Sequence, residues 1–396
     1  MKHYSAITLA VIGLALAGCA TTTSPAPRAA VSAATGDPVA DGLAMVERAP
    51  KKDRVLWQYR TALQAMRRAN FPLAKQLLDD ALLTIGNVFG PDKAAKKSRG
   101  LFNEEAKKTF IGEPYERAMA YFYRGLLYWM DGQPDNARAC FRSAQLADSD
   151  AENKTYAGDF ILCDYLDGLA TLKLGGDSSD GFKRAQANAS QVTLPAYNPK
   201  ANVLFFIELG PGPNKYSTGE YGQELRFRTF VSPVHYAVIK SGGRELARLA
   251  KFDDVNFQAT TRGGRVMDHV LANKAVFKTT TDTVGNVAVV SGAILATQRD
   301  TREAGLAVLG AGLLGKIIAS AANPAADTRA WDNLPQFLTF SALEMPPGPH
   351  QVTIEFLNAD QQTVGTFTKQ LTIRVKEPPA DTVIFISDQS ITPQNL

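Results

Sequence analysis

Apolar side chains recur at a spacing near four from about Asp53 to about Val192, with loops between the apolar runs. This spacing places the apolar residues on one face of an α-helix. Beyond Val192 the apolar positions alternate with polar ones and turn residues become frequent, which is typical of β-strands. The pattern therefore predicts an α+β multidomain fold, with an all-α helical domain at 46–193 and a β-rich domain at 200–396.

The strand pattern locates individual elements. Strand-like segments occur at 203–209, 225–231, 234–240 and 244–249. The first is an unbroken apolar run that suits a strand buried on both faces, and the last two enclose Ser241, Gly242 and Gly243, which predicts a β-hairpin. Two later stretches alternate with polar residues: Val352, Ile354 and Phe356, then Leu371, Ile373 and Val375. Strands with one buried face favour a sandwich-like β domain.

One segment of the helical part, 121–150, resembles a tetratricopeptide (TPR) repeat, in which two antiparallel helices pack against each other. Its matching positions are Gly125, Tyr128, Gly132, Ala137, Phe141 and Ala144. Gly125 and Ala137 are small where the helices come closest, and Tyr128 and Phe141 fill the space between them. Gly132 predicts the turn that joins the two helices.

Two neighbouring segments repeat this pattern more weakly. The segment 57–82 carries Ala62, Ala65, Ala74, Leu78 and Ala81, and the segment 160–187 carries Gly168, Gly175, Phe182 and Ala185. A helical bundle with small residues at its crossings is the alternative, because it also produces alanines at helical spacing. Stacked repeats leave a concave face of the kind that binds peptide segments or other domains. The helical part therefore indicates protein binding.

Two apolar runs, 284–297 and 304–322, lie between the groups of strands. They predict an inserted glycine-rich helical hairpin at about 284–322, with small positions where another helix can approach. As a helix, 304–322 would span about 28 Å, close to the roughly 30 Å of a bilayer core. Four glycines and Lys316 oppose a membrane crossing. We expect a buried or surface-lying hairpin, with a membrane contact as the alternative.

The start of the chain has the pattern of a bacterial signal peptide at 1–18. Lys2 and His3 precede the apolar stretch 7–16, which ends in small residues. The sequence Leu-Ala-Gly-Cys at 16–19 resembles the lipobox of bacterial lipoproteins, in which a peptidase cuts before a diacylated cysteine. The resemblance implies lipid on Cys19 and, because Ala20 follows, the cell outer membrane facing the periplasm. The segment 19–45 has few large apolar side chains and predicts a flexible tether.

Charge and motifs argue against several classes of function. The chain of 396 residues has a formal net charge of +4, too small to indicate nucleic acid as a partner. The histidines beyond the expected signal peptide, His235, His269 and His350, lie far apart in sequence, so no metal site is expected. The loop 209–215 lacks the Gly-Lys-Ser/Thr ending of a phosphate loop, and we expect it to be bent and exposed. No catalytic motif or cofactor fingerprint occurs, so we do not expect an enzyme.

Beyond Cys19 the cysteines are Cys140 and Cys163. Each lies in a helical pattern beside apolar neighbours, where a free cysteine behaves as a small buried hydrophobe. The oxidising compartment also allows a disulfide between them. The sequence leaves both states open.

The segment 327–335 concentrates charge, an aromatic ring and a turn before a strand. Asp327 and Arg329 are placed to form an ion pair, with Trp331 packed beside them. One interpretation is a structural corner that fixes the hairpin onto the strands. The other is a contact site for a partner protein, which makes these three residues candidate contact residues.

Together these features resemble a family of bacterial lipoproteins, mostly uncharacterised, with an N-terminal tetratricopeptide region and a C-terminal β-rich domain. The resemblance covers nearly the whole chain and rests on the lipobox, on the repeat at 121–150 and on the Asp-Thr-Arg-x-Trp-x-x-Leu-Pro run at 327–335. The family implies no established reaction or cofactor. We expect a membrane-anchored scaffold that binds protein partners through its repeats. The alternative is a structural subunit of a cell-envelope assembly that uses the β domain and the glycine-rich hairpin.

Overall fold

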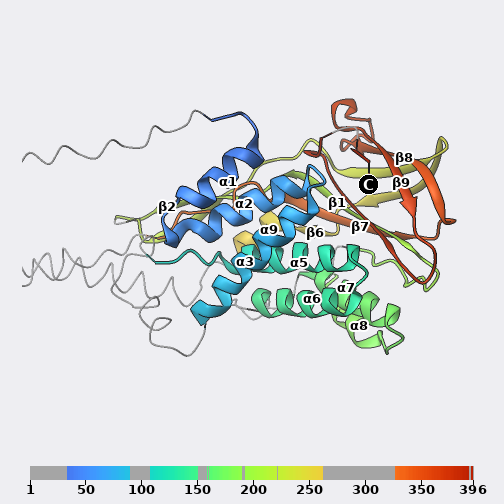
Figure 1. Cartoon of the computed structure of the whole chain (residues 1–396), viewed down its shortest axis with the longest axis horizontal. Coiled ribbons are helices and arrows are strands. Elements are labelled where there is room, and N and C mark those ends of the chain that lie inside the picture. The colour runs from blue at the N-terminus through green and yellow to red at the C-terminus, as the bar shows by residue number, and fades with distance from the viewer. Residues whose placement is uncertain are drawn as a thin grey trace, which may run out of the picture.

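The computed structural model describes residues 34–89, 108–149, 158, 160–189, 192–220, 222–261, 326–391 and 394–395. The expected signal peptide at 1–18, Cys19 and the expected hairpin at 284–322 lie outside these residues. Within them, helices dominate the N-terminal half and strands the C-terminal part, which confirms the α+β mixture (Figure 1).

Successive helices of the N-terminal half pack as pairs joined by short turns. They are α1 (Pro38–Arg48), α2 (Arg54–Met66), α3 (Phe71–Phe89), α5 (Pro114–Met130), α6 (Pro134–Asp148), α7 (Ile161–Lys173) and α8 (Ser179–Asn188), with the 3-10 turn η1 (Lys51–Asp53) before α2. Helix α2 packs on α3, α5 on α6 and α7 on α8. The three predicted segments therefore coincide with three helix pairs.

Local chemistry sets where these helices begin. Pro114 and Pro134 occupy the first turns of α5 and α6, where the backbone N–H that proline lacks has no helical partner anyway. Glu113 and Glu116 form a reciprocal capping box at the start of α5. Gly132 has a φ of 75°, which suits the left-handed turn between α5 and α6.

Helix α1 corrects the expectation for the tether. The segment 19–45 is predicted to be flexible, but α1 begins at Pro38, so the prediction was wrong for its last residues. The side chain of Asp37 caps this helix by accepting hydrogen bonds from the backbone N–H groups of Val39 and Ala40. Leu43 and Val46 then pack against the core. A few apolar side chains are therefore enough to hold this short helix in place, because they pack against the core of the protein.

The strands form two main sheets and a separate hairpin. The first sheet, in the order β10-β1-β7-β6, contains β1 (Val203–Pro211), β6 (Asp253–Asp254), β7 (Pro335–Leu343) and β10 (Thr382–Ser387). The second, in the order β11-β9-β8-β4-β5, contains β4 (Tyr236–Ser241), β5 (Arg244–Ala250), β8 (Gly348–Leu357), β9 (Lys369–Val375) and β11 (Gln394–Asn395). The hairpin is β2 (Asn214–Thr218) with β3 (Glu224–Arg228), and the short helices are α9 (Val255–Thr261) and η4 (Gly365–Phe367).

The first sheet is the middle layer of the described structure. From β1, Leu204 and Phe206 enter a core shared with the helices, whereas Phe205 and Ile207 enter a core shared with the second sheet. Both faces of β1 are buried, which explains why Val203–Ile207 is wholly apolar. Figure 1 shows β1 and β7 between the helices and strands β8 and β9. One apolar core therefore joins the helical part to the strand part.

The expected strands can be compared with the sheets directly. The segments 203–209, 234–240 and 244–249 coincide with β1, β4 and β5, and the two alternating stretches lie in β8 and β9. Gly242 and Gly243 have φ values of 56° and 77°, as a tight hairpin between β4 and β5 requires. Strand β10 has no counterpart among the expected strands, although its apolar run at 383–386 is a signal that could have located it.

Candidate functional site

The six repeat-like positions lie where α5 packs on α6. Gly125 permits the close approach, because a Cβ at this position would lie 2.8 Å from the Phe141 ring and 3.2 Å from the carbonyl O of Ala137. Ala137, Phe141 and Ala144 are fully buried. Tyr128 is only half-buried, and its ring lies 3.5 Å from the guanidinium carbon of Arg124. With Gly132 in the turn, these residues form a packing seam between helices.

The other face of α5 and α7 packs against the first sheet. Phe122 and Phe206 have ring centroids 6.1 Å apart, and Tyr165 and Phe340 have centroids 5.8 Å apart. The rings from the helices therefore cover those from β1 and β7. An open concave face was expected along these helices, but in this structure the sheet lies against it.

The corner at 327–335 also joins strands to helices. Trp331 is fully buried, and its ring stacks on Tyr59 of α2 with centroids 4.4 Å apart and an interplanar angle of 21°. Arg329 forms ion pairs of 2.6 Å with both Asp327 and Asp53. Asp327, Arg329 and Trp331 thus act as a structural corner, and they hold the chain onto α2 and η1. Trp331 retains no exposed surface for a partner.

Next to this corner, Lys215 and Glu116 form a buried ion pair. Lys215 Nζ lies 2.6 Å from Glu116 Oε2, and the two side chains are 1% and 0% exposed. Lys215 Nζ also donates to the carbonyl O of Arg329 at 3.0 Å. The backbone N–H of Trp331 donates to the other carboxylate oxygen of Glu116 at 2.7 Å. The expectation that 209–215 is an exposed loop was therefore wrong, because ion pairing draws its lysine inward.

A second buried ion pair joins Arg67, which directly follows α2 as its C-cap, to β1. Arg67 Nη2 lies 2.8 Å from Glu208 Oε2, and the Tyr123 hydroxyl donates to the other carboxylate oxygen of Glu208. Burial raises the pKa of the Tyr123 hydroxyl well above its ordinary value, so it remains a donor. Nearby, Asp388 Oδ2 accepts the backbone N–H of Gly210 at 2.6 Å. These groups are buried between layers, which suits them to joining the layers rather than to binding a ligand.

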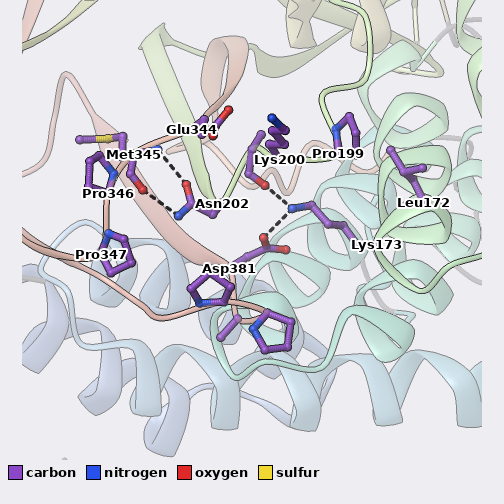
Figure 2. Close-up of a pocket in the computed structure, with 14 residues that line it drawn as sticks. Leu172, Lys173, Pro199, Lys200, Asn202, Glu344, Met345, Pro346, Pro347 and Asp381 are labelled. Atoms are coloured by element: carbon purple, nitrogen blue, oxygen red, sulfur yellow. Dashed lines mark hydrogen bonds and ion pairs between the residues drawn. The ribbon is translucent and has the colours of Figure 1, made fainter.

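An open groove of about 790 Å³ lies where α7, the connection before β1, the loop between β7 and β8 and the loop before β10 meet (Figure 2). Lys173 Nζ lies 2.7 Å from Asp381 Oδ1 and also donates to the carbonyl O of Ala201. The indole N–H of Trp129 donates to Asp381 Oδ2 at 2.9 Å. Both charged groups of this pair are therefore held by partners within the chain.

The walls of the groove are stiff. Five prolines line it: Pro199, Pro346, Pro347, Pro378 and Pro379. Because proline fixes φ, these segments have little conformational freedom to lose when a ligand binds. Asn202 ties two walls together by accepting the N–H of Met345 at 2.9 Å and donating to its carbonyl O at 2.8 Å. Lys200 and Glu344 add exposed charges of opposite sign.

The sequence analysis did not identify this groove. Its residues come from four separate segments of the chain, 172–173, 199–202, 344–347 and 378–381, and the paired prolines at 346–347 and 378–379 are the signal that could have drawn notice. Its lining residues hold no cysteine, serine or histidine that could act as a nucleophile beside a base. The arrangement can bind a ligand by shape and by charge.

The cysteines and histidines add no reactive centre to the described part of the chain. Cys140 and Cys163 are free thiols. Burial raises the pKa of the Cys140 thiol to about 11, so it stays protonated at neutral pH. Among the described residues, no group of His, Cys, Asp and Glu is placed to hold a metal ion. The same residues include no helix that is both long and apolar enough to cross a bilayer.

No protein-family model, curated protein or solved structure matches this chain. The case for a function therefore rests on the geometry of its own residues.

Proposed function

We propose that the protein is a lipid-anchored adaptor that faces the periplasm from the outer membrane and binds a protein partner without catalysing a reaction. The observation that carries this proposal is the groove lined by Lys173, Asp381 and five prolines. Its central ion pair is occupied within the chain, whereas Lys200 and Glu344 remain exposed. A stiff groove of this kind offers a ligand shape and charge rather than reactive groups.

The helix pairs are proposed to be tetratricopeptide-like repeats. The close approach at Gly125 and the succession of pairs from α2 to α8 support this interpretation. Because the first sheet lies against the inner face of α5 and α7, the groove beside α7 replaces the open concave face as the proposed partner site. The repeats then serve as a frame that positions the groove.

Attachment to the membrane is proposed to occur through lipid on Cys19. Each methylene buried in the bilayer contributes about 0.8 kcal/mol, and stable anchoring takes more than one chain, which a lipoprotein cysteine carries. The adaptor would thereby hold its partner close to the membrane surface.

Site-specific photocrosslinking in living cells tests the adaptor proposal. A photoreactive residue replaces Lys200 or Glu344 in the groove or, as a matched control, Leu146, which is 74% exposed on α6. We expect a defined protein to crosslink from the two groove positions and not from Leu146. Background proteins alone, or the same adducts from all three positions, would refute the groove as the partner site.

A second candidate is a structural subunit of an envelope assembly. Val231, Phe257 and Tyr216 are 92%, 45% and 41% exposed, and exposed apolar side chains are common at assembly contacts. Crosslinks from Phe257 to a second copy or to another envelope protein would favour this candidate. Deletion of 284–322, with folding checked, discriminates further, because an assembly subunit would lose its partners and the adaptor would keep them.

A further inference from the structure

A slot of about 400 Å³ lies between the connection 192–196, strand β5 and strand β7. Its lining includes the rings of Tyr165, Phe252 and Phe340. The centroid of Tyr165 lies 5.7 Å from that of Phe252 and 5.8 Å from that of Phe340, so the three rings form one cluster. The slot therefore combines an aromatic surface with the edge of a strand.

That edge of β7 is only partly covered. Strand β1 pairs with β7 along its length, but on the opposite side β6 pairs only with Phe337 and Leu338. The backbone N–H of Phe252 donates to the carbonyl O of Leu338 at 2.7 Å, so the backbone N–H and carbonyl groups of Leu338 point away from β1. The backbone N–H and carbonyl groups of successive residues point to alternate sides of a strand, so those of Phe340 and Ala342 also point away from β1. Among the described residues neither has a backbone partner on that side.

The edge of β5 is protected in a way that the edge of β7 is not. Strand β5 carries the exposed charged residues Arg244, Glu245 and Arg248, and its pairing with β4 shifts register between Ile239 and Lys240. Edge charges and bulges of this kind oppose the addition of another strand. The stretch of β7 that lacks a strand partner on this side has neither feature, since it carries Thr339, Phe340, Ser341 and Ala342. The Thr339 hydroxyl donates to the carbonyl O of Ala250 at the end of β5, at 2.6 Å.

We propose that the slot binds an extended acidic segment of the partner protein, which pairs as an added strand with Phe340 and Ala342. This inference rests on the adaptor function proposed above and names the kind of partner. Main-chain hydrogen bonds supply affinity in such strand addition, and neighbouring side chains supply selectivity.

Charge selects the acidic segment. The slot is lined by Arg248 and Lys251 and by no acidic residue. Arg248 is already paired with Glu245 at 2.9 Å. Lys251 is exposed, its Nζ lies 4.7 Å from the Phe337 ring, and its charge also interacts with the carboxylate of Asp254. Because the Lys251 side chain is exposed, a carboxylate on the incoming segment could interact with it as well.

The test uses the full-chain protein purified in detergent and a displayed library of random eight-residue peptides. We expect the selected peptides to be rich in Asp and Glu. A selected peptide should slow hydrogen exchange at the amides of Phe340 and Ala342. Failure to select any peptide, selection without acidic residues, or unchanged exchange at both amides would overturn the proposal.

Two variants sharpen this test. Ala342→Pro removes the outward N–H and leaves the groups that pair with β1 in place, so it should weaken peptide binding by at least about fivefold. Its matched control, Ala342→Ser, keeps the N–H and should bind within about twofold of the parent. Lys251→Gln should weaken binding of acidic peptides severalfold and reduce its dependence on salt. Equal affinity in Ala342→Pro or in Lys251→Gln, once each is shown to fold, would refute strand addition or charge selection respectively.

The slot and the adaptor function can fail separately. If partner crosslinks form at Lys200 and Glu344 but no peptide binds the slot, the adaptor function is supported and strand addition to β7 is refuted. If acidic peptides bind as expected but no partner crosslinks to the groove positions in cells, strand addition to β7 is supported and the groove is refuted as the partner site.

Discussion

The Arg67 guanidinium and the Glu208 carboxylate lie 2.8 Å apart, and both side chains are 1% exposed. The two residues are 141 positions apart in sequence and join the C-terminal cap of α2, in the helical layer, to β1 of the first sheet. Removing either charge from water costs several kcal/mol, so the pair is stable only when both partners are present. The helical layer and the first sheet are therefore expected to unfold together.

Breaking this pair should be strongly destabilising. Glu208→Gln leaves Arg67 buried without its counter-charge, and we expect the free energy of unfolding to fall by about 3–5 kcal/mol. Urea denaturation followed by circular dichroism measures the change. Glu224 pairs with Arg226 at an exposed site, 48% and 57% exposed, and Glu224→Gln is the matched control. This variant should leave the free energy of unfolding nearly unchanged, because both side chains of the pair are exposed to solvent. Equal effects at the two sites would contradict the role of burial.

The Trp331 ring should be a major determinant of stability at the corner. Trp331→Ala removes the stack on Tyr59 and leaves a cavity, so we expect a loss of about 3–5 kcal/mol. Trp331→Phe keeps part of the contact and should lose less. Val231→Ala, at a position 92% exposed, is the control and should stay within about 0.5 kcal/mol. A Trp331→Ala protein as stable as this control would show that the corner is dispensable.

Replacing glycine by alanine should change the stability of the protein in opposite directions at two helical positions, Gly125 and Gly86. A Cβ at Gly125 would lie 2.8 Å from the Phe141 ring, so Gly125→Ala should destabilise the protein by about 1–3 kcal/mol. At Gly86 in α3 nothing lies within 4 Å of such a Cβ. There, Gly86→Ala should stabilise by about 0.5–1 kcal/mol, because alanine restricts the unfolded chain. Thermal melts of both variants measure the two changes, and a melting temperature that rises in Gly125→Ala would argue against a tight helix seam.

The pKa of Asp388 should make stability depend on pH. Burial raises the pKa of this carboxyl above its ordinary value of 3.8, and among the described residues its Oδ1 has no hydrogen-bond partner. A group that is easier to protonate in the folded state stabilises that state below pH 3.8, and this contribution is lost as the pH rises through the raised pKa.

Asp388→Asn removes this titration. We therefore expect the stability of the variant relative to the parent to increase as the pH rises above 3.8. Urea unfolding of both proteins over a series of pH values provides the measurement. A difference that is constant with pH, or that shrinks as pH rises, would exclude a raised pKa at Asp388.

Lipid attachment should depend on one cysteine. Cys19→Ser is expected to prevent incorporation of labelled fatty acid and to move the protein from the membrane fraction to the soluble fraction. Cys140→Ser is the control, because Cys140 is a free thiol within a helix and should leave fractionation unchanged. Retention of Cys19→Ser in the membrane fraction would mean that another feature anchors the chain.

The sequence alone predicted features whose causes are local. The spacing of apolar residues predicted the helix pairs because it repeats with the period of a helix. Ser241, Gly242 and Gly243 predicted the β4–β5 hairpin because glycine adopts the positive φ values that the turn requires. Gly125 marked the α5–α6 seam because a close approach excludes a larger side chain.

Only the tertiary structure decided which surfaces meet. Glu208, Lys215 and Arg67 are charged, and charged residues usually remain at the surface, so nothing in their local sequence indicates burial. Each becomes buried because a partner from a distant segment satisfies its charge. The groove likewise forms only where four separate segments converge. The open edge of β7 exists because β6 pairs with just two of its residues. Periodicity determines which residues lie on one face of an element, whereas long-range packing determines what that face contacts.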